Sequence, residues 1–318
     1  MDVIRLAPHD PQFAALHALY LRTQQRPFDA PWALEELRAN LSDDAYAQHV
    51  VLLALDDGDP VGCAWVELPL QDNRETVFVE VHVAPERRRR GVGSALLERC
   101  RAVAREHGRS RVYAETTWDV AETTGPGLAF AEHHGFGVDL LDAIREQPLP
   151  APPVEAPLRD GYTAVAWRIC PPQWLEQYAH LRHLILTEAP AGPSGIEGEY
   201  FDAARIRHEE ERWASVGRTG QTVAAIAPDG RLAGHTQLVV STGQETAYQW
   251  DTLVLREHRG HGLGLALKVR ALSEAADLLA GVRRIVTWNA ASNTHMIAVN
   301  ERLGYRQIAW AAEVVGPA

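Results

Sequence analysis

Apolar residues along this chain gather in short runs separated by polar, turn-forming stretches, and the whole succession occurs twice. Apolar runs of strand length span residues 50–55, 61–68 and 77–83 in the first round, and 223–227, 232–240 and 247–255 in the second. Further strands are predicted at 3–6, 111–116, 163–168 and 283–287. The third run of each round is followed by a segment, 91–107 or 262–279, whose apolar positions recur with the period of an α-helix. Because several strands precede each helix, we expect an α/β fold with a mixed, α+β type of sheet rather than a doubly wound one.

A proline-rich segment separates the two rounds. It contains the run QPLPAPPVEAP, whose prolines exclude a helix interior and favour an extended chain. The 318 residues suffice for two domains that each bury a core. The sequence therefore predicts an N-terminal domain at 1–146, a linker at 147–158 and a C-terminal domain at 159–318.

The two predicted domains repeat each other in sequence. The first contains VEVHVAPERRRRGVGSALLERC and the second contains WDTLVLREHRGHGLGLALKVRA. Aligning Gly91 with Gly262 also aligns Gly93 with Gly264, and the strand before each glycine pair aligns as well. Duplication of a whole domain explains this match better than chance does.

The repeated element consists of a strand, the motif Arg-x-x-Gly-x-Gly and a helix. Glycines permit positive φ and close approach, and the unpaired N–H groups at the helix start bind phosphate. A P-loop would need Gly-Lys-Ser/Thr, and a dinucleotide fingerprint would need a third glycine where Leu96 and Leu267 stand. The motif thus indicates a phosphate-bearing ligand of another type, and the alternative is a tight turn with solvated arginines.

These residues resemble the acyl-CoA signature of the GNAT acetyltransferase superfamily. The matching segments are Val83-x-Pro85-x-x-Arg88-x-x-Gly91-x-Gly93 and Val254-x-x-x-x-Arg259-Gly260-x-Gly262-x-Gly264. The second half is also similar to tandem GNAT proteins of actinobacteria, and the two-domain plan is similar to that of mycothiol synthase. The resemblance implies an acyltransferase with two tandem GNAT domains and with acetyl-CoA, or another acyl-CoA, as cosubstrate.

The resemblance also implies which positions contact the cofactor. In this family the fourth strand splays from its neighbour at a bulge, and pantetheine lies in the gap. The implied contacts are Val83, Arg88, Arg89, Arg90, Gly91, Val92, Gly93 and Ser94 in the first domain, and Val254, Leu255, Arg259, Gly260, His261, Gly262, Leu263, Gly264 and Asn293 in the second.

Acyl transfer to an amine needs a proton acceptor, and the candidates are carboxylates near each motif. Asp251 and Glu80 each lie three residues before the motif valine, so the duplication places them equivalently. Each is a candidate general base, with a cation-binding role or a solvent-facing position as alternatives. The family's acidic tyrosine is replaced by Asn300 in the second domain and by Ala131 in the first. Asn300 is the third catalytic candidate, because it can hydrogen-bond the sulfur or a water, although it cannot titrate.

The two domains are not equivalent in these positions. The second retains Asn293, Asn300 and Asp251, whereas the first has DVAETTGPG where the asparagine is expected. We therefore predict that the second domain is catalytic and that the first either binds acyl-CoA or has become a scaffold.

Other residues are ambiguous in the sequence. We expect Trp118 and Trp288 to pack beside the cofactor groove, with core packing as the default alternative, and we consider Tyr200 and Trp250 for the acceptor cleft. The run HEEERW at 208–213 either lines a site for a cationic acceptor or forms a solvated helix face.

The bulk composition limits partners and compartment. A formal net charge of -11 argues against nucleic-acid binding, and it suits a cationic substrate or serves solubility. The three cysteines have no paired spacing, so neither a disulfide framework nor a metal site is expected. No signal peptide or membrane segment is recognisable, and a cytoplasmic location is expected. A monomer and a homodimer are both compatible with tandem duplication.

Three functions remain open from the sequence. The first is N-acetylation of a primary amine on a small molecule, such as an aminosugar, antibiotic or metabolite. The second is acetylation of an amino-acid amine as in mycothiol synthase. The third is non-catalytic or regulatory binding of acyl-CoA, which the missing tyrosines would allow.

Overall fold

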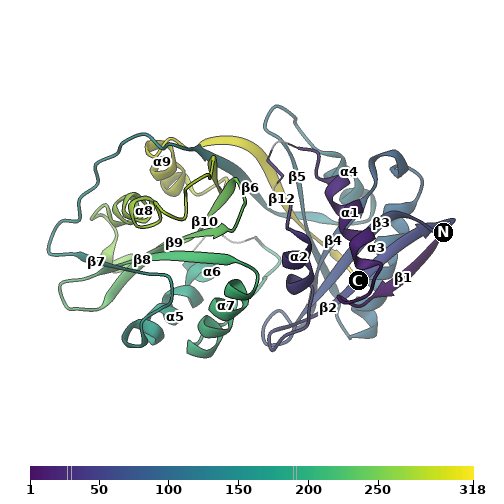
Figure 1. The fold of residues 1–318 in the computed structure, drawn as a ribbon, viewed down its shortest axis with the longest axis horizontal. Coiled ribbons are helices and arrows are strands. Elements are labelled where there is room, and N and C mark those ends of the chain that lie inside the picture. The colour runs from purple at the N-terminus through teal and green to yellow at the C-terminus, as the bar shows by residue number, and fades with distance from the viewer. Residues whose placement is uncertain (27, 30, 189, 191) are drawn as a thin grey trace. The chain divides into compact units, whose positions relative to one another are not determined.

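A computed structural model describes residues 1–26, 28–29, 31–188, 190 and 192–318 (Figure 1). The chain forms two compact units. Unit 1 comprises Met1–Leu141 together with Ala311–Ala318, and unit 2 comprises Asp142–Trp310. Each unit contains a mixed β-sheet with helices packed on it, as the alternation of apolar runs predicts.

Unit 1 contains the first round of elements. They are β1 (Asp2–Leu6), α1 (Phe13–Thr23), α2 (Leu34–Asn40), β2 (Ala47–Asp56), β3 (Asp59–Pro69), β4 (Thr76–Val83), a 3-10 turn (Pro85–Arg87), α3 (Val92–Glu106), β5 (Arg111–Asp119) and α4 (Pro126–His133). Strands β1 to β4 pair antiparallel in sequence order, and β5 pairs parallel with β4. On one face Phe13 and Leu16 of α1 pack with Leu53 and Trp65. Because strand side chains alternate between faces, the other face is left for α3.

Unit 2 repeats this arrangement. Its elements are β6 (Gly137–Pro148), β7 (Thr163–Trp167), a 3-10 turn (Pro172–Trp174), α5 (Leu175–His183), α6 (Ile185–Glu188), α7 (Ala203–Ser215), β8 (Arg218–Ile226), β9 (Leu232–Ser241), β10 (Thr246–Val254), a 3-10 turn (Arg256–His258), α8 (Leu263–Glu274), β11 (Arg284–Ala290), α9 (Thr294–Arg302) and β12 (Arg306–Pro317). The first five residues of β6, Gly137 to Leu141, and the part of β12 from Ala311 onward fall in unit 1. The strand order within unit 2 is β6-β11-β10-β9-β8-β7.

Strand β8 of unit 2 is covered on both faces, and the alternation of its side chains shows how. Val223 and Ala225 pack with Leu267 of α8, whereas Ala224 between them packs with Tyr178 of α5 and Ile206 of α7. All of these side chains are at most 2% exposed. The period of two therefore gives β8 two buried faces and separates an α8 side from an α5–α7 side.

Strand β6 and strand β12 are divided between the units. Residues 142–148 pair antiparallel with β11, from Asp142 opposite Ala290 to Pro148 opposite Arg284. The final segment instead belongs to unit 1, where the Ala318 amide donates to the Ser110 carbonyl at 3.1 Å. The compact units therefore differ from the ranges 1–146 and 159–318, because each unit takes a strand segment from the other half of the sequence.

The part of the chain that the structure describes contains no candidate transmembrane helix. None of its helices is both long enough and apolar enough to span a bilayer.

We expect Gly316→Val to destabilise unit 1. A Cβ at Gly316 would lie 2.7 to 2.9 Å from ring atoms of the buried Phe136, so the ring would have to move. Overpacking of this kind costs about 1–3 kcal/mol. Chemical denaturation measures the loss, and limited proteolysis should cut first within residues 1–141.

The matched control is Gly137→Ala, because a Cβ there meets nothing within 4 Å. Its denaturation midpoint should stay at the wild-type value. Equal midpoints for the Gly316 and Gly137 variants would show that the C-terminal segment does not pack in unit 1 as described.

Candidate functional site

Two parallel strands separate at the same place in each unit. In unit 2, β10 pairs with β11 from Thr246 opposite Arg284 to Tyr248 opposite Val286, and the pairing ends there although both strands continue. In unit 1, β4 and β5 likewise pair only as far as Phe78. Beyond this point the two backbones do not pair directly, although in unit 2 the Thr287 hydroxyl of β11 still donates to the Gln249 carbonyl of β10 at 3.1 Å. The predicted gap beside the fourth strand is thus a feature of both units.

Only β10, among the described strands that follow this plan, carries a bulge beside the gap. Gln249 is opposite Leu238, and the next registered pair is Thr252 with Thr236, so two residues of β10 face the single Gln237. In β4 the register with β3 runs from Phe78 to Val83 without a shift. Accordingly β10 has 9 residues and β4 has 8. The second unit therefore contains one extra residue at the position where the strands diverge.

The bulge places two neighbouring side chains on one face. In a regular strand Trp250 and Asp251 would point to opposite faces. Here Asp251 contacts Arg182 of α5 at 2.7 Å, and the Trp250 ring lies 6.3 Å from that of Trp213 in α7. Both side chains therefore lie on the α5–α7 side, next to the gap.

The glycine loops are built alike in the two units. Gly91 and Gly262 adopt φ of 85° and 72° and precede α3 and α8, whose first turns have no side-chain cap. The arginine of each motif folds back across its loop, because Arg259 Nε donates to the Val254 carbonyl at 3.1 Å and Arg88 Nε donates to Val83 at 3.2 Å. Uncapped N–H groups and a nearby guanidinium form a site for an anion such as a pyrophosphate.

The space above the second glycine differs between the loops. A Cβ on Gly264 would meet nothing within 4 Å, whereas one on Gly93 would lie 3.3 Å from the Phe130 ring. His134 adds to this cover, since its Nε2 lies 3.0 Å from Ser94 Oγ. In unit 1, side chains of α4 and its C-terminal end thus occupy the region that is open in unit 2.

The other residues predicted to contact the cofactor fall into two groups. Val92 and Leu263 are buried, so only their backbone groups can face a ligand. Arg89, Arg90 and Gly260 lie on the exposed part of the loops, and Leu255 follows the end of β10.

Two polar residues of the predicted cofactor site already have partners. His261 Nδ1 lies 2.7 Å from Asp160 Oδ2, and Asn293 caps α9 by accepting the Met296 N–H at 3.2 Å. Arg259 additionally pairs with Glu188, the last residue of α6, at 2.8 Å. A bound pyrophosphate would therefore compete with one carboxylate for this arginine.

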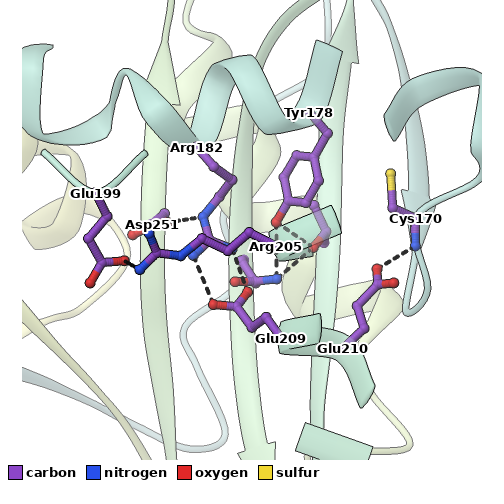
Figure 2. Close-up of polar contacts among 10 residues, drawn as sticks. Cys170, Tyr178, Arg182, Glu199, Arg205, Glu209, Glu210 and Asp251 are labelled. Atoms are coloured by element: carbon purple, nitrogen blue, oxygen red, sulfur yellow. Dashed lines mark hydrogen bonds and ion pairs between the residues drawn. The ribbon is translucent and has the colours of Figure 1, made fainter. Parts of the chain in front are cut away.

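Asp251 belongs to a buried ion cluster (Figure 2). Arg182 contacts Asp251 through Nε at 2.7 Å and binds both oxygens of Glu209, at 2.7 and 3.2 Å. The Arg182 guanidinium lies 4.4 Å from the centre of the Phe201 ring, and its side chain is only 4% exposed. This cluster fixes the carboxylate of Asp251 at the bulge.

Burial and charge oppose each other in this cluster. Burial raises the pKa of Asp251, while Arg182 lowers it. For Arg182, burial acts to lower the pKa, but Glu209 and Asp251 outweigh it and the pKa lies well above its ordinary value. The Arg182 guanidinium therefore stays charged, and Asp251 is the member of the cluster whose pKa is set by the balance between burial and charge.

Glu80, the counterpart of Asp251, has a different environment. Its side chain is 48% exposed and lies 3.2 Å from His82 on the same strand. Without the bulge, Glu80 follows the regular alternation of β4 opposite Trp65. The duplication therefore preserves a carboxylate but not its surroundings.

Asn300 is fully buried, and its amide is engaged at both ends. Its Oδ1 accepts from Lys268 Nζ at 2.8 Å, and its Nδ2 donates to Asn289 Oδ1 at 2.7 Å. Lys268, the chain's single lysine, is 2% exposed, and burial lowers its pKa to about 7. Asn300 thus links α8, α9 and β11 in the interior, and its amide oxygen accepts the hydrogen bond from Lys268.

Aromatic side chains continue from the bulge across the sheet. Trp250 is 44% exposed and Trp288 is 39% exposed, and Tyr248 lies between them with ring centres 6.4 and 6.1 Å away. The expectation of core packing is therefore wrong for Trp288, because this face of β11 is open, and it is confirmed for Trp118, which is 4% exposed.

Sequence reasoning missed two components of the site. Nothing in the sequence distinguishes Arg182 from the other arginines, and Lys268 was notable only as a rare residue type. Glu209 lies in the HEEERW run, and its neighbour Glu210 accepts the Cys170 N–H at 2.7 Å. Two of these carboxylates therefore point inward, and the run is not simply a solvated helix face.

No candidate metal centre occurs in the described part of the chain. It contains no group of three or more His, Cys, Asp or Glu residues arranged to hold a metal ion. The three cysteines are buried free thiols.

The buried lysine gives a stability prediction that depends on pH. Its pKa is 10.5 in the unfolded chain and about 7 in the folded one, so between these values only the unfolded chain binds the proton. The free energy of unfolding of the wild type should then rise by about 1.4 kcal/mol per pH unit relative to Lys268→Met. Urea denaturation measures the free energy of unfolding of both proteins. The value for the wild type minus the value for Lys268→Met should be about 2–3 kcal/mol larger at pH 9 than at pH 7.

Arg270→Met serves as the control, because Arg270 lies on the same helix in an exposed ion pair with Glu274. The free energy of unfolding of Arg270→Met should differ from that of the wild type by the same amount at both pH values. A pH-independent difference for Lys268→Met as well would mean that the lysine is not buried in the way described.

Comparison with known proteins agrees with this architecture. The Acetyltransferase (GNAT) family matches residues 13–136 and again residues 180–305. The mycothiol acetyltransferase of Salinispora tropica is 27% identical over 291 residues, which cover 91% of this chain and 86% of that protein. The mycothiol acetyltransferase of Salinispora arenicola is similar to the same extent.

Solved structures show the same fold over the whole chain. A tandem GNAT protein from the clavulanic acid biosynthesis pathway, without AcCoA, has a TM-score of 0.81 at 26% identity and covers 99% of this chain and 98% of its own. A GCN5-related N-acetyltransferase from Sphaerobacter thermophilus has a TM-score of 0.72 at 19% identity, over 99% and 95% of the two chains. Since the family matches both halves, this chain belongs to the acetyltransferase (GNAT) family as a tandem acyltransferase.

Proposed function

We propose that unit 2 transfers the acetyl group of acetyl-CoA to a primary amine of a small molecule, and that unit 1 serves as a non-catalytic scaffold. GNAT enzymes use acetyl-CoA. The observation that carries the assignment is the bulge in β10, which sets Asp251 beside the open gap. Unit 1 has no shift of register at this place in its described strands, and its loop is covered by Phe130.

The residues of unit 2 fit an acyl-CoA. The N–H groups of the first turn of α8 and the guanidinium of Arg259 would hold the pyrophosphate, and the open space at Gly264 lets it approach the backbone. The edge of β10 beyond Gln249, which does not pair with β11, would bind the pantetheine amides as a neighbouring strand does. The cosubstrate supplies the thioester carbonyl that an amine attacks.

Asp251 is the group placed to accept the proton of the acceptor amine. The amine reaches the site as an ammonium and must lose a proton before its nitrogen can bond to the acyl carbon. Burial raises the pKa of Asp251, which makes it a better base than an exposed aspartate, and Arg182 opposes that rise. As the carbon–nitrogen bond forms, the carbon–sulfur bond breaks and the thiolate departs.

The relatives favour a second candidate function. The Salinispora proteins named mycothiol acetyltransferase align with 91% of this chain. The acceptor would then be the amine of a mycothiol-type thiol. A panel of amines that includes such a thiol would distinguish this candidate from a general small-molecule amine.

Acetyl-CoA binding should depend on unit 2 alone. Gly264→Ala fills the space that a phosphate would need but touches nothing in the protein, so it should keep the wild-type stability and weaken acetyl-CoA binding at least about tenfold. Isothermal titration calorimetry of the wild type should give one site per chain. Arg88→Ala should leave that site intact, whereas Arg259→Ala should weaken it.

A stoichiometry of two, with one site lost in the Arg88 variant, would contradict the scaffold role of unit 1. The absence of any acetyl-CoA binding would contradict the proposed function as a whole.

Asp251→Asn should slow the chemical step. An asparagine keeps the shape but cannot take a proton, so kcat should fall by about 10²–10⁴-fold while acetyl-CoA affinity is retained. The rate of CoA thiol release with a reactive amine measures kcat. Glu80→Gln in unit 1 is the matched comparison, and an equal loss there would show that the carboxylates of both units take part.

A further inference from the structure

The ion cluster at the bulge sets two carboxyl groups against one guanidinium. Arg182 contacts both Glu209 and Asp251 at 2.7 Å, and burial together with Glu209 raises the pKa of Asp251, as expected where two carboxyl groups share one cation. The residues around the cluster do not restore the balance: His235 is neutral, because burial lowers its pKa to about 3, and burial raises the pKa of Tyr178 to about 12. Among the described residues, Asp251 is paired with Arg182. The cluster therefore favours the arrival of one more positive charge.

The same cluster offers no cation to an arriving carboxylate. The Arg182 side chain is 4% exposed, with its Nε toward Asp251 and both terminal nitrogens toward Glu209. The neighbouring arginines on α7 already have carboxylate partners, since Arg205 lies 3.2 Å from Glu199 and Arg207 lies 2.6 Å from Glu210. Figure 2 shows Arg205 and Glu199 in front of the Arg182 cluster. A ligand carboxylate next to Asp251 would meet two carboxylates without a free partner of its own.

The surface beside Asp251 is aromatic. Trp250 precedes Asp251 on the bulge, and its exposed ring begins the series that continues through Tyr248 to Trp288. Adjacent exposed aromatic rings bind a flat or apolar body, and their faces also attract cations. The site thus combines a carboxyl group that favours a cation, Asp251, with an aromatic surface next to it.

We propose that the acceptor of unit 2 is a cationic primary amine that is attached to an aromatic body and has no free carboxylate beside the amine. This inference rests on the proposed function of unit 2 and narrows its substrate class. The ammonium completes the charge of the Arg182 cluster at Asp251, and the aromatic body packs on Trp250 and Tyr248. Free α-amino acids are excluded because their carboxylate would lie against Asp251 and Glu209.

Three compounds with one aromatic body test the charge requirement: tyramine, tyrosine and tyrosinamide. We expect tyramine and tyrosinamide to be acetylated with kcat/KM at least about 100-fold above that of tyrosine, since an uncompensated carboxylate in such a site costs several kcal/mol. Calorimetric binding of each amine to the protein in complex with CoA should show the same order. Acetyl-CoA consumption and binding are thus measured on the same full-length protein.

Two variants separate charge from packing. Glu209→Gln removes one negative charge, so the preference for tyramine over tyrosine should shrink at least about tenfold. Trp250→Ala removes the exposed ring, so tyramine should lose affinity while the ratio between tyramine and tyrosine is kept. Thermal midpoints check that each variant is folded.

The outcomes distinguish the inference from the function on which it rests. Acetylation of tyrosine as fast as tyramine, or equal binding of the two, overturns the inference and leaves the acetyltransferase function standing. Selective binding of tyramine without any acetyl transfer supports the charge requirement and overturns the proposed function. Failure of all three amines to bind overturns the inference.

Discussion

One extra residue in β10 determines the surroundings of the whole candidate site. A strand that keeps its alternation presents either Trp250 or Asp251 to the α5–α7 side, and the bulge presents both. A carboxylate brought under helices in this way needs a cation, because an isolated buried charge costs several kcal/mol. Arg182 supplies that cation, and its own burial is compensated by Glu209 and by the Phe201 ring. The ion cluster is thus a consequence of the bulge rather than an independent feature.

The two units show how one motif can be retained while its use changes. Both loops keep a left-handed glycine and an arginine folded back on the strand carbonyl, because these features form the turn between strand and helix. The turn is required for folding whether or not a ligand binds. Ligand access depends instead on what lies above the next glycine, and there unit 1 has the ring of Phe130 where unit 2 is open. A matching motif in the sequence therefore indicates the turn in both units, whereas the space above the second glycine is open only in the loop of unit 2.

Local patterns were sufficient to predict most elements but not how the chain distributes them. Alternation and helical period located strands such as β2 and β9 and the helices after the glycine loops, since those patterns depend on burial alone. Strand β12 is apolar on alternate residues all along its length and could complete either sheet, so its passage into unit 1 at Ala311 was not readable. The exposure of Trp288 and the pairing of Arg182 likewise depend on contacts between segments distant in sequence. Periodicity indicates which side of a helix or strand is buried, but it does not indicate which other segment of the chain covers that side.

The absence of the family's tyrosine is compatible with catalysis because of the chemistry of the leaving group. A thiol with a pKa of about 8.5 leaves as a thiolate near neutral pH without a proton from the enzyme, whereas an amine cannot attack until it has lost one. The proton acceptor is therefore the indispensable partner and the acid is not. Position 300 is then free for a structural role, and Asn300 uses its amide to satisfy Lys268 and Asn289 in the interior. In the proposed function the proton transfer takes place at the bulge, where Asp251 is held, and the unit without a bulge has an exposed carboxylate, Glu80, and a loop covered by Phe130.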